Sequence, residues 1–187
     1  LNETKPIVLI FGGSQGAQKI NEALIDIIEQ KKNKNYQIIW ATGPKQFDII
    51  KNELSNKSIN IQKIENCKIL PYIYNMEEMI NISDLIVARS GAMTITEISN
   101  LGKPSILIPL PNVSHNHQLY NAQVLEKIGA AKIILDNELK GENLQKTIMQ
   151  ILQGNTVKTM GKNALKAETK DAEDRIYSEI VQLVRKE

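Results

Sequence analysis

Short apolar runs alternate with amphipathic stretches along this chain, and the alternation predicts its architecture. The run at 6–11 is continuously apolar, which is typical of a strand buried on both faces of a sheet. Comparable runs recur downstream. They predict strands at 6–11, 36–41, 59–64, 84–88, 105–109 and 130–135, with a further short strand at 68–70.

Between these runs, apolar side chains recur every three or four residues, which predicts helices. In the first, at about 17–31, they share one face: Ile20, Ala23, Leu24, Ile27 and Ile28. Further helices are predicted at 45–54, 76–82, 93–101 and 118–128, and two or three more complete the chain. The last takes its apolar face from Ile176, Ile180, Leu183 and Val184.

Strands that alternate with helices predict the α/β class, with a Rossmann-like, doubly wound, open parallel sheet. Ligands of such sheets bind beyond the carboxyl ends of the strands. The loops at 12–16, 42–45, 71–75, 89–94 and 110–118 are therefore the candidate binding loops.

Composition adds limits to this picture. The 187 residues suit one domain at 6–187 after a polar linker at 1–5. A net charge of +2 and an aromatic content of 4% give no argument for nucleic acid as a partner. The single Cys67 fits a reducing cytoplasm and excludes both an internal disulfide and a multi-cysteine metal site. With no apolar leader or long apolar span, we expect a cytoplasmic chain.

The loop at 12–16 is rich in glycine. Gly12, Gly13 and Gly16 allow a backbone to approach a ligand closely, and Ser14 adds a hydroxyl group. The loop lacks both the G-x-G-x-x-G dinucleotide fingerprint and the Gly-Lys-Ser/Thr of a Walker loop. A tight strand-to-helix turn explains the same residues equally well.

The most informative segment is 89–97. After a buried strand, Ser90 and Gly91 make a sharp turn into a helix. The first backbone N–H groups of that helix, at Ala92, Met93 and Thr94, are predicted to face a diphosphate.

Two side chains of the same segment carry alternatives. Glu97, about one turn into the helix, would accept hydrogen bonds from a ribose diol; its alternative role is a favourable charge near the helix N-terminus. Arg89 either pairs with a phosphate or braces the turn.

Two further loops carry weaker signals. Both histidines, His115 and His117, lie in one polar loop, but no acidic or cysteine partner has metal-ligand spacing. His117 and Gln118 are better placed to bind sugar hydroxyls, with a solvated loop as the alternative. The backbone of Ile73 offers an N–H and a carbonyl to the edge of a base, although core packing explains this residue more simply.

Three motifs of this chain occur together in one protein family. The segments 12–16 and 89–97, followed by His117-Gln118-x-x-Asn121-Ala122, have the order and spacing of the MurG family. These bacterial enzymes transfer N-acetylglucosamine to lipid I, giving lipid II. The resemblance runs from about Pro6 to the end. It implies the C-terminal, donor-binding half of a two-domain GT-B fold, without the N-terminal acceptor half.

The resemblance also implies a role for each site residue. Ser14 would contact the donor near its phosphates, Ile73 would bind uracil through its backbone, and Glu97 would hold the ribose. Ala92, Met93 and Thr94 would bind the diphosphate through their N–H groups. Gln118 would bind sugar hydroxyls, whereas His117 stands where the family often has Gln.

The implied chemistry is displacement with inversion at the anomeric carbon, with no cofactor and no metal. The catalytic base would lie on the absent half, so the isolated chain would bind UDP-N-acetylglucosamine without catalysing transfer. The whole enzyme would act on lipid I as a peripheral protein at the cytoplasmic face of the membrane.

Three alternatives remain. A UDP-N-acetylglucosamine 2-epimerase shares the fold but needs cleft acids and histidines, of which only 115–118 gives a hint. A stand-alone donor-binding subunit of a two-chain transferase is a second possibility, although Leu1 in place of Met favours a cut fragment. An NAD-binding domain is disfavoured by the missing fingerprint and by the lack of an acid at 41–43.

Overall fold

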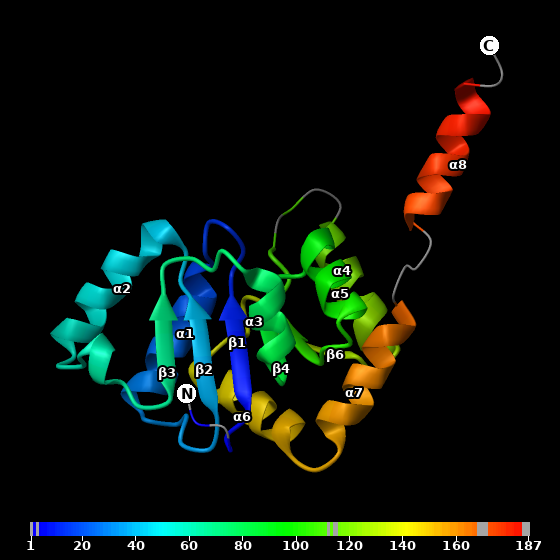
Figure 1. The fold of residues 1–187 in the computed structure, drawn as a ribbon. Coiled ribbons are helices and arrows are strands. Elements are labelled where there is room, and N and C mark those ends of the chain that lie inside the picture. Colours follow the sequence, from blue (N-terminus) through cyan, green and yellow to red (C-terminus); the bar gives the residue numbers. More distant parts are fainter. Residues whose placement is uncertain (1, 3, 112, 114–115, 168–171, 185–187) are drawn as a thin grey trace.

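Six parallel strands form a single sheet in the order β3-β2-β1-β4-β5-β6 (Figure 1). This computed structural model describes every residue except 1, 3, 112, 114–115, 168–171 and 185–187. The strands are β1 (Ile7–Phe11), β2 (Gln37–Ala41), β3 (Cys67–Leu70), β4 (Leu85–Ala88), β5 (Ser105–Leu107) and β6 (Ala131–Ile133). The predicted α/β class with a parallel sheet is confirmed.

Helices connect the strands, as the alternation predicted. They are α1 (Gln18–Glu29), α2 (Pro44–Asn56), α3 (Met76–Ile82), α4 (Ala92–Asn100), α5 (His117–Lys127), α6 (Gly141–Leu152), α7 (Thr156–Ala164) and α8 (Ala172–Val184). Two short 3₁₀ segments, η1 (Ile61–Lys63) and η3 (Leu165–Ala167), complete the described elements.

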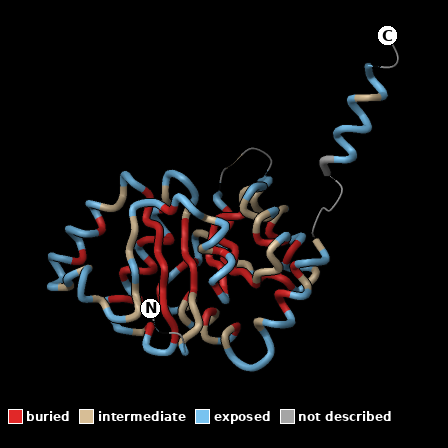
Figure 2. The backbone as a smooth tube through the Cα atoms, in the orientation of Figure 1, coloured by how far each residue is buried: buried red, intermediate tan, exposed pale blue. Residues whose placement is uncertain are grey.

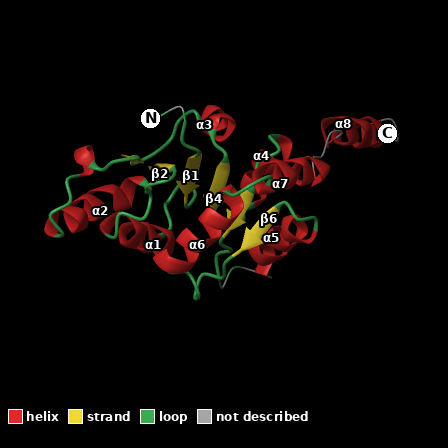
Figure 3. Cartoon of the chain, turned by 90° about the horizontal axis from the view of Figure 1, so that it is seen from below, coloured by secondary structure: helices red, strands yellow, loops and turns green. Residues whose placement is uncertain are grey.

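The sheet separates two apolar cores, because successive strand residues point to opposite faces. Val8 and Ile10 of β1 pack with α1, α2 and α6, whereas Leu9 and Phe11 pack with α3, α4 and α5. Figure 2 shows the burial concentrated in the strands, and Figure 3 shows helices on both sides of them. Two-sided burial explains why these strands read as continuous apolar runs.

One predicted strand is wrong. Residues 59–64 contain the short 3₁₀ segment η1 in place of a strand, and the Asn60 side chain at its N-cap accepts a hydrogen bond of 2.9 Å from the Gln62 N–H. Ile59, Ile61 and Ile64 still pack against the core, so their apolar character reflects burial without strand pairing. The shorter run behind them pairs with β2 and forms the edge strand β3.

The strand order reverses direction between β1 and β4, since β2 and β3 extend the sheet on one side and β5 and β6 on the other. β1 pairs directly with β4, with Phe11 beside Ala88 at their carboxyl ends. The loops that follow these strands, 12–17 and 89–91, therefore flank the switch point at which open α/β sheets bind ligands.

The last helix stands apart from this body. Figure 1 shows α8 projecting away from the sheet and its helices. Its apolar residues are exposed, including Ile176 (61%), Ile180 (54%) and Leu183 (68%). In the part of the chain that the structure describes, α8 and the other helices are all too short or too polar to cross a membrane.

Candidate functional site

The glycine-rich loop joins β1 to α1 and packs tightly on one side only. A Cβ on Gly12 would lie 2.3 Å from the Ala17 nitrogen, and a Cβ on Gly16 would lie 2.2 Å from the Thr42 carbonyl oxygen. By contrast, a Cβ on Gly13 would meet nothing within 4 Å, and Ser14 is exposed. The tight-turn explanation therefore accounts for Gly12 and Gly16, while Gly13 and Ser14 face open space.

A buried amide holds this loop against the end of β2. The Asn21 side chain, 3% exposed, donates to the Thr42 carbonyl oxygen at 3.0 Å and accepts from the Trp40 indole N–H at 2.9 Å. No role was predicted for Asn21 from the sequence. Its signal was a polar residue inside the apolar stretch Ile20–Ile28, where a buried amide needs partners.

The turn after β4 presents the start of α4 to the same edge of the sheet. The Gly91 carbonyl accepts the helix hydrogen bond from the Ile95 N–H at 3.0 Å, so the N–H groups of Ala92, Met93 and Thr94 precede the first helical bond. Gly91 has no side chain with which to cap them, and no described side chain makes a capping bond. The three N–H groups that the sequence singled out are thus those at the helix start.

Met93 is 74% exposed, and a Cβ on Gly91 would meet nothing within 4 Å, so this helix end is open. Such an end carries the positive pole of the helix dipole and binds anions. It lies across the switch point from the glycine-rich loop.

Glu97 lies on α4 in the turn that follows these N–H groups, and it is half-buried. Burial raises the pKa of its carboxyl above the ordinary value of 4.5, because a lower-dielectric surrounding disfavours the charged form. A half-buried carboxylate next to an anion-binding helix end is suited to accept hydrogen bonds from hydroxyl groups.

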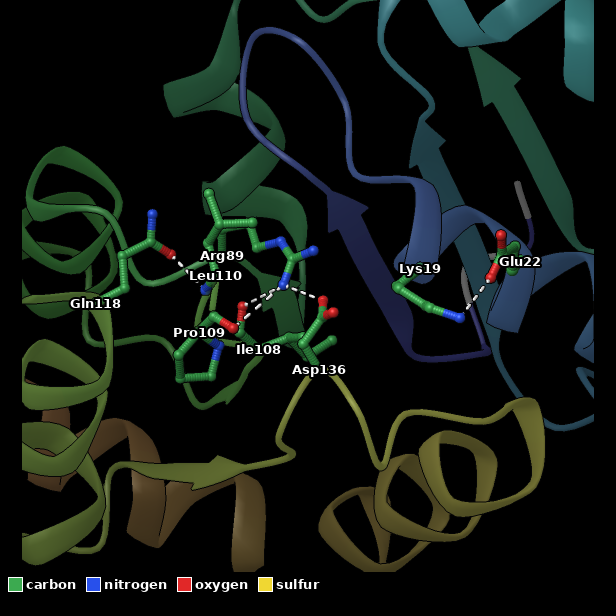
Figure 4. A network of polar contacts seen from close by, with 8 residues as sticks. All are labelled: Lys19, Glu22, Arg89, Ile108, Pro109, Leu110, Gln118 and Asp136. Carbon is green, nitrogen blue, oxygen red and sulfur yellow. Dashed lines mark hydrogen bonds and ion pairs between the residues drawn. The ribbon is translucent and has the colours of Figure 1, made fainter. Parts of the chain in front are cut away.

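Arg89 braces the turn. Its Nη1 lies 2.6 Å from Asp136 Oδ1 and donates to the carbonyl oxygens of Ile108 and Pro109 at 3.1 and 3.3 Å (Figure 4). Only 10% of its side chain is exposed. Of the two roles predicted for Arg89, these contacts support bracing. Asp136 was missed, although a carboxylate soon after β6 lies at the same sheet edge as Arg89.

The start of α5 is tied to the turn after β4. Ser90 Oγ donates to the Gln118 carbonyl oxygen at 2.7 Å, and Asn121 Nδ2 donates to the Ser90 carbonyl oxygen at 3.0 Å. Gln118 Oε1 accepts from the Leu110 N–H at 3.0 Å. These bonds bring Gln118 beside the segment 89–91, as the predicted site requires. His117 is exposed at the first position of α5, and His115 lies outside the described residues.

Ile73 lies in the loop between β3 and α3. Its side chain is 5% exposed and packs into the core shared with β1 and β4. The flanking rings of Tyr72 and Tyr74 contact each other edge to face, with centroids 5.1 Å apart. The core-packing explanation of the Ile73 side chain is therefore correct, while its backbone role stays a prediction.

No three His, Cys, Asp or Glu side chains gather into a metal-binding group within the described residues. At the switch point the structure brings together groups that are suited to bind an anion and hydroxyl groups. Uncapped N–H groups, a half-buried carboxylate and an oriented glutamine surround the carboxyl ends of β1, β4 and β5.

The family of this chain follows from its similarity to known proteins. The sequence profile of the glycosyltransferase family 28 C-terminal domain matches residues 7–176. The chain belongs to this family. Its sheet, its switch-point loops and most of its helices lie within the matched range.

Two curated members of the family are closely similar. Both are named UDP-N-acetylglucosamine–N-acetylmuramyl-(pentapeptide) pyrophosphoryl-undecaprenol N-acetylglucosamine transferase. The protein of Lactobacillus johnsonii is 42% identical over 186 residues, 99% of this chain and 49% of the relative. That of Oenococcus oeni is 41% identical over 98% of this chain and 49% of the relative. The chain spans about half the length of these curated relatives.

A solved structure supports the same family assignment. The crystal structure of Acinetobacter baumannii MurG superposes with a TM-score of 0.80 at 27% identity, and the match covers all of this chain and 54% of that one. The chain therefore has the fold of the C-terminal half of a GT-B glycosyltransferase, as the motifs at 12–16, 89–97 and 117–122 predicted.

Proposed function

We propose that this chain binds UDP-N-acetylglucosamine and forms the donor site of an inverting N-acetylglucosaminyltransferase that converts lipid I to lipid II. The observation that carries the proposal is the uncapped N-terminus of α4, opposite the glycine-rich loop at the switch point. The names of the two family members that are 42% and 41% identical to this chain supply the identity of the sugar and of the acceptor.

Each part of the site has a chemical task. The N–H groups of Ala92, Met93 and Thr94 hold the diphosphate, and they stabilise the charge that develops on UDP as the glycosidic bond breaks. Glu97 accepts from the ribose hydroxyls, and the backbone of Ile73 pairs with uracil. Ser14 lies on the phosphate side and Gln118 on the sugar side.

The remaining chemistry is assigned to the rest of the transferase. The acceptor hydroxyl attacks the anomeric carbon from the face opposite UDP, and a base removes its proton. That base and the lipid I site belong to the half of the relatives that this chain does not match. In this proposal the whole enzyme works at the cytoplasmic face of the membrane.

Titration calorimetry tests the proposal. UDP-N-acetylglucosamine, UDP, UDP-N-acetylgalactosamine and NADH are titrated separately into the chain. We expect binding of the first two, with UDP-N-acetylglucosamine preferred over its galactosamine isomer. Binding of NADH alone, or no heat with either uridine ligand, would contradict it.

A further inference from the structure

Gln118 is held in one orientation by a backbone group. The Leu110 N–H is a hydrogen-bond donor, so the atom that it contacts at 3.0 Å has to be the amide oxygen of Gln118. The amide nitrogen then points away from Leu110, as Figure 4 shows. In this orientation Gln118 offers its amide N–H groups to a ligand on the side away from Leu110.

The position of Leu110 depends in turn on Arg89. Arg89 Nη1 donates to the carbonyl oxygens of Ile108 and Pro109, the two residues directly before Leu110 (Figure 4). These bonds fix the backbone where β5 ends and the loop toward α5 begins. A shift of this short segment would move the Leu110 N–H away from Gln118.

Asp136 sets the direction of Arg89. Its carboxylate lies 2.6 Å from Nη1, and the two side chains are only 15% and 10% exposed. Asp136 comes from the loop between β6 and α6, so the ion pair connects the carboxyl ends of β4 and β6 across β5. Arg89 without this carboxylate would keep its charge in a buried place and would reorient toward water.

We propose that Asp136 is a positioning residue for the donor sugar: through Arg89 and the segment 108–110, it fixes Gln118 so that the amide N–H groups face the sugar oxygens. The inference rests on the proposed function, because the sugar is the ligand assigned to Gln118. In this proposal Asp136 acts through Arg89, with which it forms the ion pair, and does not itself contact the substrate.

The first test compares UDP-N-acetylglucosamine with UDP in Asp136→Asn, Asp136→Ala and the conservative Asp136→Glu. Loss of one oriented hydrogen bond weakens binding by about threefold to tenfold. We expect this loss for UDP-N-acetylglucosamine in the Asn and Ala variants, a smaller change for UDP, and partial recovery in the Glu variant. Glu29→Gln is the matched control, since it removes the carboxylate of an exposed ion pair of 2.7 Å with Lys57.

A second readout needs no ligand. Amide hydrogen exchange followed by NMR reports the Leu110 N–H, and the side-chain NH₂ resonances report Gln118. In Asp136→Asn we expect faster exchange at Leu110 and shifted Gln118 resonances, with no such change in Glu29→Gln. Unchanged Leu110 exchange in both the Asn and the Ala variant would overturn the inference.

The two readouts separate this inference from the proposed function. A wild-type chain that binds neither uridine ligand would contradict the proposed function, while the exchange experiment would still decide whether Asp136 positions Gln118. Faster Leu110 exchange with an unchanged preference for UDP-N-acetylglucosamine over UDP would overturn the link to the sugar.

Discussion

Glu97 combines two requirements that oppose each other. In the proposed donor site its carboxylate has to be ionised to accept two hydroxyl hydrogen bonds from the ribose, yet burial raises its pKa and so disfavours the ion. A group whose pKa is raised on folding contributes stability below its unfolded pKa, and that contribution is lost as the pH rises through the folded pKa. In its ionised form the side chain therefore weakens the fold, while the proposed donor site requires that same charge to bind the ligand.

Replacement of Glu97 by Gln is expected to separate these effects. Loss of charge-assisted hydrogen bonds should weaken binding of UDP-N-acetylglucosamine by about 10- to 100-fold, as calorimetry would show. The melting temperature should stay the same or rise slightly. Glu53→Gln, on the exposed side of α2, is the control and should change neither.

The raised pKa also predicts how binding depends on pH. As the pH falls through the pKa of Glu97, affinity should drop, and the drop should begin at a higher pH than for an ordinary glutamate. UDP-N-acetylglucosamine is the suitable ligand, because both ends of its diphosphate are esterified and its charge stays constant. A pH profile that is the same in Glu97→Gln would contradict this assignment.

Gly91 offers a test of the three N–H groups at the start of α4. A serine here would cap the helix and occupy one of those N–H groups, at Met93 or Thr94, which should stabilise the chain by a few tenths of a kcal/mol and weaken binding of the diphosphate. An aspartate should weaken binding further through its charge. Gly91→Ala is the control: it adds a Cβ in open space, cannot cap, and should leave binding little changed. Equal binding by all three variants would place the diphosphate elsewhere.

Individual roles followed from sequence only where local chemistry decides them. The N–H groups of α4 could be located from the Ser90-Gly91 turn alone, because a helix start exposes its first N–H groups. Arg89 could not be decided, since its bracing role depends on Asp136 and on the end of β5. Those partners lie far along the chain and meet Arg89 only after the strand order is fixed.

The glycine-rich loop shows how one element accommodates two different glycine requirements. Gly13 and Gly16 both have left-handed backbone angles, with φ of 85° and 80°. Only Gly16 also packs against another backbone, at the end of β2. The loop therefore has an inner side set by packing and an outer side set by conformation alone.

Alanine substitutions should separate these requirements. Gly13→Ala should reduce the free energy of unfolding by about 1–2 kcal/mol, the cost of a left-handed non-glycine residue. Gly16→Ala should cost clearly more, because its Cβ would lie 2.2 Å from the Thr42 carbonyl oxygen. Urea unfolding with an unchanged m-value measures both. Equal losses would mean that Thr42 and Gly43 shift easily, against the close packing described.

Elements were predicted well where apolar periodicity and burial coincide. β1 and β4 are buried on both faces and match their apolar runs, and α3 ends where it was predicted to end. The failure at 59–64 has the opposite cause. There, apolar side chains are partly buried from a turn that a single asparagine stabilises, and periodicity cannot distinguish such a turn from a strand.

The whole molecule gathers its site from segments that are distant in sequence. Parallel strands require crossovers, so the loops after β1, β4, β5 and β6 meet only because the sheet order is β3-β2-β1-β4-β5-β6. The side of the sheet that binds ligand was predictable from the fold class. The loops that face each other across the switch point were not predictable, because the local pattern of apolar and polar residues does not determine the order of the strands.

At the scale of the whole molecule, α8 is expected to add little to stability, because the sheet and its two apolar cores are formed by the other elements. Its side chains at Ile176, Tyr177, Ile180 and Leu183 are 54–71% exposed. A chain that ends after Ala167 should therefore unfold with a free energy within about 0.5 kcal/mol of the full chain, as for other exposed positions.

The matched control is a chain that ends after Asn163. It removes Ala164, which is fully buried, and Leu165, which covers Gly102. Because it opens the core between α4 and α7, it should unfold in clearly less urea than the chain that ends after Ala167. If removal of α8 alone destabilised the protein as much as this shorter truncation, the apolar face of α8 would have to pack against the body in solution.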